Sequence, residues 1–383
     1  MRVLVAPDKF KGSLTAEAAA EAMAAGWRDA WPGAEVVCCP VADGGEGTAA
    51  AVCAALGGTW REHTVRDPLG RPIRARYALV GPADDRTAFV ECSAASGFLH
   101  VAPRERDLPQ ASTFGTGELL AHAFAEPSVR RVIVGLGGSA TNDGGLGMAA
   151  ALGYAFLDAE GKPIPPVPRE LGRLATVLPP PVRPWEERLV TAACDVGNPL
   201  LGPRGATRVY GPQKGLQPAQ QEALEDGLRR LADVAAFCLG ADCREVAGAG
   251  AAGGLGFGLM TFCGATLEPG FGLVTRLLDL DAAVAAADLV LTGEGSADAQ
   301  SLEGKAPHGV AALACRYRKP VVLLAGHIPP ADRPALREHF DALYALTDTG
   351  HSLDECLRDA ALILRQAAAM VASEWRARRG VRT

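Results

Sequence analysis

The sequence predicts an α/β protein built from two α/β domains. Apolar, β-branched runs alternate with Ala- and Leu-rich helical patterns along most of the chain, which is typical of mainly parallel sheets covered by helices. Hydrophobic residues make up 48% of the chain and charged residues 21%, so we expect packed cores rather than disorder. A chain of 383 residues is long enough for two domains of ordinary size.

Both ends of the chain show a regular alternation of strand and helix patterns. Near the start, strands are expected at 3–6 and 35–40, with a helix at 15–27 that Thr15 caps. Toward the end, strands are expected at 289–292, 321–325 and 342–346, and helices near 309–316 and 353–379. Because domain termini commonly lie close together, residues 1–66 and 285–383 are predicted to form one discontinuous, flavodoxin- or Rossmann-like domain.

The pattern changes near residue 59. Two runs of alternating polar and apolar residues, 59–65 and 73–80, flank the turn Asp67-Pro68-Leu69-Gly70, which predicts a β-hairpin. A hairpin interrupts the strand–helix alternation, so we interpret it as the exit from the first domain. The inserted α/β domain is then predicted to span residues 67–284, with a Pro-rich surface loop at 162–184.

Charge and cysteine content exclude several classes of protein. A net charge of −6 argues against nucleic acid or an anionic membrane surface as the main partner. The ten cysteines include no CxxC pair, so we expect reduced, buried thiols rather than a zinc ribbon or a disulfide framework. The apolar runs are too short for a signal peptide or a membrane span, so a cytoplasmic location is expected.

The segment GLGGSATNDGG, residues 135–145, lies between an expected strand at 130–134 and an expected helix at 146–156. Its start fits the dinucleotide fingerprint G-x-G-x-x-A, but the TNDGG that follows would break the helix that this fingerprint requires. We therefore interpret it as a longer loop. Its main-chain N–H groups and the N-terminus of the following helix can hold an anion. The side chains expected to face a ligand or a metal are Ser139, Thr141, Asn142 and Asp143.

Three other glycine-rich stretches contain or adjoin carboxylates. They are VADGGEGT (41–48), GAGAAGGLG (248–256) and LTGEGSAD (291–298). Glycine lets the main chain approach a ligand closely, and carboxylates placed there suit Mg²⁺ or a substrate hydroxyl. Lysine is scarce in this arginine-rich chain, yet Lys9, Lys11, Lys214 and Lys305 lie in or beside Gly-containing turns. A point charge there can offset the charge of phosphate groups.

The residues alone leave other classes open. The chain has neither a Walker P-loop, nor the protein-kinase motif set, nor a G-x-S-x-G nucleophile elbow. One alternative is an NAD-dependent oxidoreductase acting on a small hydroxy acid, based on G-x-G-x-x-A at Gly135. Another is a two-domain ligand-binding protein without activity. The carboxylates among the glycine-rich loops argue against that alternative, because a pocket for an anion gains nothing from added negative charge.

Seven segments, in order along the chain, together resemble the type I glycerate kinase family. They are APDKFKGSL (6–14), VADGGEGT (41–48), GLGGSATNDGG (135–145), CDVGNPL (194–200), GPQKG (211–215), GAGAAGGLG (248–256) and TGEGSADAQ (292–300). The resemblance covers the whole chain. It implies two α/β domains with the active site in the cleft, and ATP-dependent phosphorylation of D-glycerate with Mg²⁺, generally to 2-phosphoglycerate. Where the family commonly has Ser, this chain has Lys9, which favours Lys11 as the functional lysine.

With this resemblance in view, roles can be assigned as hypotheses. Asp195 is expected to orient the attacking hydroxyl or take its proton, while Lys11 and Lys214 offset charge on the γ-phosphoryl group. Asp43 and Asp298 are the expected metal ligands. The other expected substrate or nucleotide contacts are Asp8, Ser13, Gly44, Gly45, Glu46, Gly137, Gly138, Ser139, Asn142, Asp143, Asn198, Gly253, Gly254 and Glu294.

The resemblance also leaves points open. The carboxylate of glycerate needs a cation, and the sequence does not decide between Lys11 and an arginine such as Arg66. We expect small molecules as partners, no nucleic acid or membrane, and a monomer or a homodimer.

Overall fold

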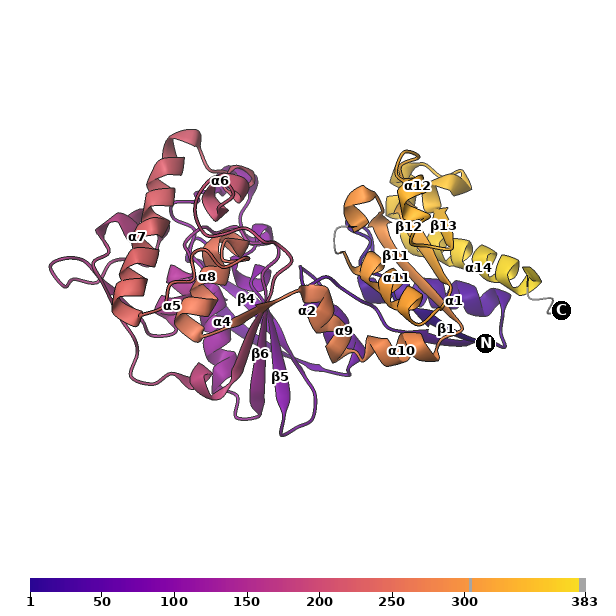
Figure 1. The fold of residues 1–383 in the computed structure, drawn as a ribbon, viewed down its shortest axis with the longest axis horizontal. Coiled ribbons are helices and arrows are strands. Elements are labelled where there is room, and N and C mark those ends of the chain that lie inside the picture. Colours follow the sequence, from indigo (N-terminus) through magenta and orange to yellow (C-terminus); the bar gives the residue numbers. More distant parts are fainter. Residues whose placement is uncertain (303–304, 379–383) are drawn as a thin grey trace. The chain divides into compact units, whose positions relative to one another are not determined.

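The computed structural model describes residues 1–302 and 305–378, and the chain divides into two compact units (Figure 1). The first unit contains Met1–Asp43, Ala50–Gly57 and the chain from Phe271 onward; the second contains Gly44–Ala49 and Gly58–Gly270. Both units combine a sheet with helices, so the predicted α/β class is confirmed. The first unit boundary, at Gly57, precedes the predicted one after residue 66, because the strand at 59–66 pairs in the second unit's sheet. The second, at Gly270, precedes the predicted one after residue 284.

The first unit is built on a parallel sheet of five strands in the order β13-β12-β11-β1-β2. The strands are β1 (Arg2–Val5), β2 (Glu35–Cys38), β11 (Leu289–Ser296), β12 (Val321–His327) and β13 (Ala342–Ala345). Counted within this unit, the order is the 2-1-3-4-5 of flavodoxin-like sheets, and the strand order reverses between β1 and β11. Ligands of such sheets bind at the carboxyl ends of the strands beside this reversal.

Helices cover both faces of this sheet. They are α1 (Ala16–Ala30), most of α2 (Thr48–Ala55), nearly all of α9 (Gly270–Leu277), α10 (Leu280–Ala286), α11 (Ala306–Arg316), α12 (Arg333–Leu336), α13 (Leu353–Arg358) and α14 (Ala360–Arg378). Val3 packs in the core under α1 and α14, whereas its neighbour Leu4 packs under α10 and α11. The predicted cap is confirmed, because the Thr15 side chain accepts a hydrogen bond from the Ala18 N–H. The predicted last helix breaks into α13 and α14, and its predicted end at residue 379 lies outside the described residues.

The second unit has a six-stranded mixed sheet in the order β10-β9-β6-β5-β4-β3. Its strands are β3 (Thr59–Arg66), β4 (Pro72–Val80), β5 (Arg86–Glu91), β6 (Val129–Gly135), β9 (Leu189–Ala193) and β10 (Thr266–Glu268). Strands β5, β6, β9 and β10 are parallel, and β3 and β4 form the predicted hairpin. A separate antiparallel pair, β7 (Ala155–Leu157) and β8 (Thr176–Leu178), includes part of the predicted Pro-rich loop.

The helices of this unit surround one large apolar core. They are α3 (Ser93–Ser96), α4 (Phe114–Ala125), α5 (Leu146–Ala151), α6 (Ala206–Tyr210), α7 (Gln221–Leu239) and α8 (Ala251–Cys263). The expected helix at 146–156 is too long: α5 ends at Ala151, and Gly153 with φ +96° turns the chain into β7. Short 3₁₀ helices at Phe98–His100, Pro103–Glu105, Pro168–Arg173, Pro184–Glu187, Pro212–Lys214, Pro218–Gln220, Ala299–Leu302 and Leu346–Thr349 complete the chain.

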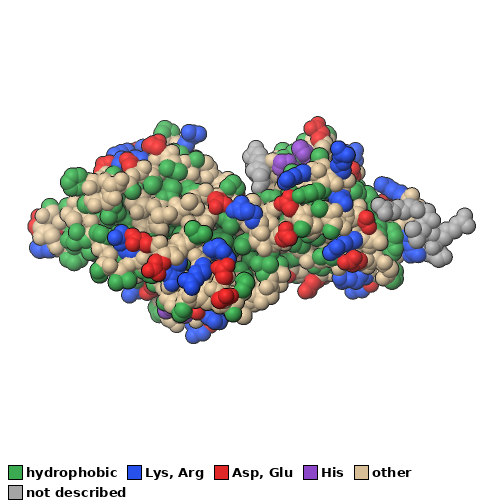
Figure 2. Space-filling view, turned by 60° about the horizontal axis from the view of Figure 1, so that its bottom comes forward, with side chains coloured by type: hydrophobic (Ala, Val, Ile, Leu, Met, Phe, Trp, Pro, Cys, Tyr) green, Lys and Arg blue, Asp and Glu red, His purple; other side chains and the backbone are tan. Residues whose placement is uncertain are grey.

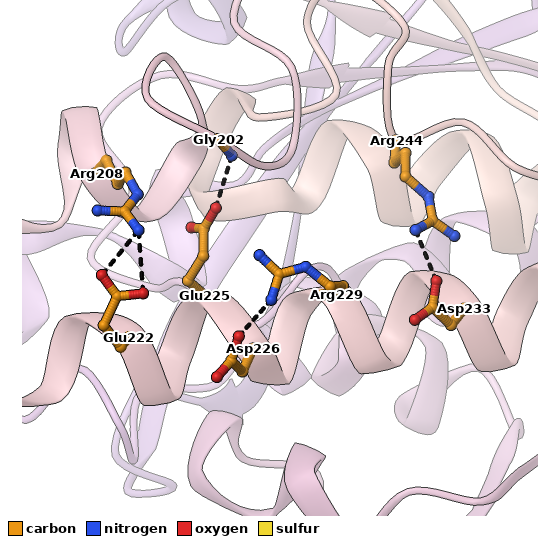
Figure 3. A network of polar contacts seen from close by, with 8 residues as sticks. All are labelled: Gly202, Arg208, Glu222, Glu225, Asp226, Arg229, Asp233 and Arg244. Carbon is orange, nitrogen blue, oxygen red and sulfur yellow. Dashed lines mark hydrogen bonds and ion pairs between the residues drawn. The ribbon is translucent and has the colours of Figure 1, made fainter.

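Helix α7 anchors the segment that follows β9. The buried Glu225 accepts a hydrogen bond from the Gly202 N–H at 2.6 Å, and Glu222 pairs with Arg208 of α6 at 2.8 Å (Figure 3). Further along the same helix, Asp233 pairs with Arg244. The chain between β9 and α7 is therefore held against this helix at Gly202 and at Arg208.

The surface carries both signs of charge. On the face drawn in Figure 2, lysine and arginine side chains lie interspersed with aspartate and glutamate. This distribution agrees with the small negative net charge. Among the described helices, none has the length and apolar character that crossing a bilayer requires.

Candidate active site

One edge of the second unit's sheet gathers several of the predicted site residues. Glu91, Gly135 and Ala193 stand opposite one another at the carboxyl ends of β5, β6 and β9. The glycine-rich loop after Gly135 and the segment that carries Asp195 therefore leave the sheet from neighbouring positions. Because ligands of parallel sheets bind at the carboxyl ends of the strands, this edge is the candidate site of the second unit.

The Gly44–Ala49 segment lies over the same edge. A Cβ on Gly44 would lie 3.3 Å from Asp195 Oδ2, and a Cβ on Gly137 would lie 2.8 Å from the Cα of Gly45. Such distances explain the glycines, because a side chain at either position would displace the neighbouring segment. The structure thus brings together six predicted residues from three segments: Gly44, Gly45, Glu46, Gly137, Gly138 and Asp195.

Lys214 places a buried cation beside this loop. Its Nζ donates hydrogen bonds to Ser139 Oγ at 2.8 Å and to the carbonyl oxygen of Thr141 at 2.7 Å. Burial disfavours the charged amine and lowers the pKa of Lys214 to about 8. Within residues 1–302 and 305–378, the main-chain N–H groups of Gly137, Gly138 and Ser139 have no acceptor. A cation and three adjacent donors are suited to hold an oxyanion.

Asp143 does not face a ligand as predicted. It is completely buried, and its oxygens accept hydrogen bonds from the Thr113 N–H and hydroxyl and from the N–H groups of Gly145 and Gly147, all at 2.8–3.1 Å. The Leu146 N–H donates to the Asp143 carbonyl oxygen. The prediction that this helix N-terminus holds an anion is therefore wrong, since the chain itself supplies the acceptors for these amides.

The side chains of Asn142 and Asn198 also form hydrogen bonds within the protein. The buried Asn142 donates from Nδ2 to Thr207 Oγ1 at 3.0 Å, and its Oδ1 has no partner among the described residues. The Asn198 amide donates to the Arg204 carbonyl oxygen at 2.7 Å and accepts from the Tyr210 hydroxyl at 2.7 Å. Asn198 therefore shapes the loop that follows Asp195.

The glycines at the start of α8 are used for packing. Ala252, Gly253 and Gly254 have left-handed φ values of 52°, 70° and 85°. A Cβ on Gly253 would lie 2.0 Å from the Thr141 carbonyl oxygen, and one on Gly254 would lie 2.8 Å from the Cα of Gly144. Gly253 and Gly254, predicted as ligand contacts in the 248–256 stretch, thus lie directly against the 141–144 segment, which accounts for these glycines without a ligand.

The first unit carries a second group of predicted residues, at the reversal of its strand order. Asp8 follows β1, Asp43 follows β2, and Glu294 lies near the end of β11. Burial, together with the negative charges of Asp43 and Glu294, raises the pKa of Asp8 to about 7, although the Lys9 N–H donates to it at 2.6 Å. Burial also raises the pKa of Glu294, whose Oε2 lies 3.5 Å from Lys305 Nζ.

These carboxylates could supply some, but not all, of the ligands of a divalent cation. Glu294 Oε1 is buried and has no partner among the described residues, and the repulsion among Asp8, Asp43 and Glu294 would be relieved by a cation. Asp298, the other predicted metal ligand, lies 3.9 Å from Lys305 Nζ. Residues 1–302 and 305–378 contain no group of three His, Cys, Asp or Glu that could hold a metal alone. Mg²⁺ in kinases takes one or two carboxylates together with phosphates, so the ion would need only part of this group as ligands.

Lys11 lies beside the carboxylates of the first unit, because a Cβ on Gly295 would lie 2.8 Å from the Lys11 main-chain nitrogen, whereas Ser13 and Arg66 have other partners. Lys11 is exposed, and the Ser13 hydroxyl donates to the Phe10 carbonyl oxygen at 3.1 Å. The guanidinium of Arg66 lies 4.3 Å above the Phe114 ring. Its Nε is 3.7 Å from Glu118.

Sequence reasoning missed several residues that build the site. Thr113 bonds to Asp143, and Glu91 accepts the Ala49 N–H at 2.7 Å. Ser301 accepts from Lys305 Nζ at 3.3 Å. None of these residues lies in a glycine-rich motif, so no local pattern distinguishes them from other polar residues.

Comparison with known proteins places the chain in a family. The model described as "Glycerate kinase family" matches residues 3–376. The chain is 42% identical to a glycerate kinase of Bacillus subtilis (strain 168), covering 97% of each chain, and 42% identical to a glycerate 2-kinase of Escherichia coli (strain K12), covering 94% of each. A crystal structure from Salmonella typhimurium LT2, provisionally assigned as glycerate kinase 2, superposes with a TM-score of 0.88 at 41% identity and complete coverage of both chains. The chain therefore belongs to the glycerate kinase family.

Proposed function

We propose that this protein transfers the γ-phosphoryl group of ATP to the C2 hydroxyl of D-glycerate, with Mg²⁺ bound, and releases ADP and 2-phosphoglycerate. Membership of the family makes the protein a kinase of glycerate, and a kinase of this kind takes ATP as its phosphate donor. The assignment of the C2 hydroxyl is supported by a relative that carries the name glycerate 2-kinase.

The observation that carries the proposal is the donor group beside Lys214. Phosphoryl transfer depends on positioning and on stabilising charge at the phosphoryl oxygens. The N–H groups of Gly137, Gly138 and Ser139 supply hydrogen-bond donors in one loop, and Lys214 supplies a cation beside that loop. Gly138, with φ +70°, is exposed, so this part of the loop lies at the surface. We assign these groups to the transferred phosphoryl group.

Asp195 is our candidate for the general base. Its carboxylate is exposed at the same sheet edge, and the Gly270 N–H donates to Oδ1 at 2.9 Å, which fixes its orientation. In the proposed step, the substrate hydroxyl oxygen bonds to the γ-phosphorus as the bond from that phosphorus to the β,γ-bridging oxygen breaks. The hydroxyl proton passes to Asp195, and ADP leaves with the bond's electron pair.

Asp8, Asp43 and Glu294 would hold Mg²⁺ together with the phosphates of ATP. The ion would neutralise charge on the β- and γ-phosphates when bound. Asp298 stays a proposed ligand, and its contact with Lys305 would then have to be exchanged for the metal. Lys11 stays a proposed contact for the nucleotide.

The product is identified by ³¹P and ¹³C NMR after incubation of the enzyme with D-glycerate, ATP and MgCl₂. In the proton-coupled ³¹P spectrum, splitting by the single C2 proton is expected, and splitting by the two C3 protons instead would contradict the proposed position of transfer. Omitting MgCl₂ and adding a chelator is expected to abolish turnover. A reaction that continues at full rate without divalent cations would remove Mg²⁺ from the proposal.

Asp195→Asn tests the general base. The amide keeps an acceptor for the Gly270 N–H but cannot take the proton, so kcat is expected to fall roughly 10³-fold with the melting temperature unchanged. Glu187→Gln, an exposed carboxylate of the same unit, serves as the matched control and is expected to keep full activity. Asp195→Asn retaining more than a third of wild-type kcat would exclude this role.

A further inference from the structure

Arg106 lies against the turn that carries Lys214. Its Nη1 donates to the Gln213 carbonyl oxygen at 3.3 Å, and its Cβ would lie 3.0 Å from a Cβ on Gly215. On the other side, the guanidinium carbon lies 4.7 Å from the centroid of the Phe98 ring. The guanidinium group is thus fixed between an aromatic ring and the lysine turn, which favours a defined orientation.

The same aromatic residue connects Arg106 to the glycine-rich loop. The Phe98 N–H donates to the Gly138 carbonyl oxygen at 3.2 Å, and the preceding Gly97 forms a β-bridge with Ser139. Ser139 in turn accepts the hydrogen bond from Lys214. Arg106 therefore belongs to the same local structure as Lys214 and the amides assigned to the phosphoryl group.

Arg106 has no carboxylate partner among the described residues. In the same unit, Arg71 pairs with Asp67 at 2.6 Å, and Arg66 lies beside Glu118. The Nε of Arg106 is buried without an acceptor, although the residue as a whole is half-exposed. A half-exposed guanidinium with unused donors and no acidic partner is suited to bind a carboxylate through two parallel hydrogen bonds.

The substrate needs such a partner. In D-glycerate, C2 bears both the carboxylate and the C2 hydroxyl, so the carboxylate must lie close to the group that is phosphorylated. The candidate site also contains the carboxylates of Asp195 and Glu46, which would repel it without a cation. Lys214 is assigned to the phosphoryl group, and Arg66 has Glu118 as its partner.

We propose that Arg106 binds the carboxylate of glycerate and so makes the enzyme select a 2-hydroxy acid over a neutral polyol. The proposal rests on the function proposed above, and it supplies the cation that the sequence left undecided between Lys11 and an arginine such as Arg66. No glycine-rich motif contains Arg106, so its position in the fold is the evidence for this role.

The experiment compares D-glycerate with glyceramide, in which a neutral amide replaces the carboxylate. For Arg106→Ala, KM for D-glycerate is expected to rise roughly 100-fold, whereas kcat/KM for glyceramide changes less than about threefold. Arg106→Lys keeps the alkyl stem and the charge but loses the paired donors, so KM for D-glycerate is expected to rise roughly tenfold. Arg104→Ala removes an exposed arginine two residues away and is expected to match the wild type with both substrates.

The two substrates separate binding from support of the turn. If Arg106 only supported the Lys214 turn, Arg106→Ala would lower kcat/KM by the same factor for both substrates, and the proposal would be overturned. An active Arg106→Ala enzyme with wild-type KM for D-glycerate would also overturn it. If Arg106→Ala does not fold, the same comparison made with Arg106→Lys decides the question. A wild-type enzyme that forms no ADP from ATP and D-glycerate would overturn the proposed function itself, which is a distinct result.

Discussion

Asp8 is a residue whose burial is unfavourable to the fold in the absence of a ligand. The residue is 6% exposed, and burial together with the negative charges of Asp43 and Glu294 raises the pKa of Asp8 from 3.8 to about 7. A folded state that keeps the proton to higher pH than the unfolded state loses stability as pH rises between these two values. Each pKa unit corresponds to about 1.4 kcal/mol. The free energy of unfolding that the shifted pKa of Asp8 removes at high pH therefore has an upper limit of about 4 kcal/mol.

Asp8→Asn is therefore expected to be more stable than the wild type above pH 7, by about 2–4 kcal/mol, and equally stable below pH 4. The asparagine oxygen keeps an acceptor for the Lys9 N–H, so the variant removes only the charge. Urea denaturation at pH 4, 6 and 8, without nucleotide or metal, measures the difference. Asp84→Asn, at an exposed position, is the control. A stability difference that stays constant over this pH range would show that the Asp8 charge does not cause it.

At the scale of elements, Asp143 joins the beginnings of α4 and α5. It accepts hydrogen bonds from Thr113, just before α4, and from Gly147 in the first turn of α5. Asp143→Ala would leave these buried donors without an acceptor, so the free energy of unfolding is expected to fall by about 3–4 kcal/mol. Denaturant unfolding measures this loss.

Thr113 provides the matched comparison for Asp143. Its hydroxyl donates to Asp143 and accepts the Met148 N–H, so Thr113→Val is expected to lose about 1–2 kcal/mol, whereas Thr113→Ser keeps wild-type stability. If Asp143→Ala unfolds at the wild-type denaturant concentration, the carboxylate does not stabilise this helix pair.

The sequence predicted the strand pattern well and the uses of the glycines poorly. Alternation and turn residues predicted β3 and β4, and the Thr15 side chain marked the start of α1, because these signals act over a few residues. Gly138 and Gly253 look alike in sequence and both have positive φ. Gly138 is exposed, whereas Gly253 is buried against Thr141. Only contacts between distant segments distinguish a ligand loop from close packing of two main chains.

Prediction of the candidate site was limited in the same way, because local motifs do not show which distant segments meet. Motifs located the segments carrying Asp195 and Lys214, which the structure places at one sheet edge and beside one loop. Motifs did not reveal that Asp143 points into the protein, since the residue type and the spacing fit either orientation. The predicted position of the active site in a cleft between the domains stays a prediction.

At the scale of the whole molecule, the two units differ in how their sheets are assembled along the chain. The second unit's sheet and core use residues between Gly58 and Gly270 alone. In the first unit, β1 pairs with β2 on one side and with the central strand β11, nearly 300 residues later, on the other. Its core combines Trp27 of α1 with Leu364 of α14.

A fragment of residues 58–270 is accordingly expected to fold alone, whereas a fragment of residues 1–57 is not. The longer fragment keeps all six strands of its sheet and loses only the Gly44–Ala49 segment, which contributes no strand. The shorter fragment keeps two strands of a five-stranded sheet and leaves Val3, Val5 and Trp27 without the apolar partners that bury them. Near-ultraviolet circular dichroism and the dispersion of amide NMR signals report the packing of each fragment, and urea denaturation should show a cooperative transition for residues 58–270 only. A fragment 58–270 that lacks such a transition would mean that the second unit requires the first to complete its folding.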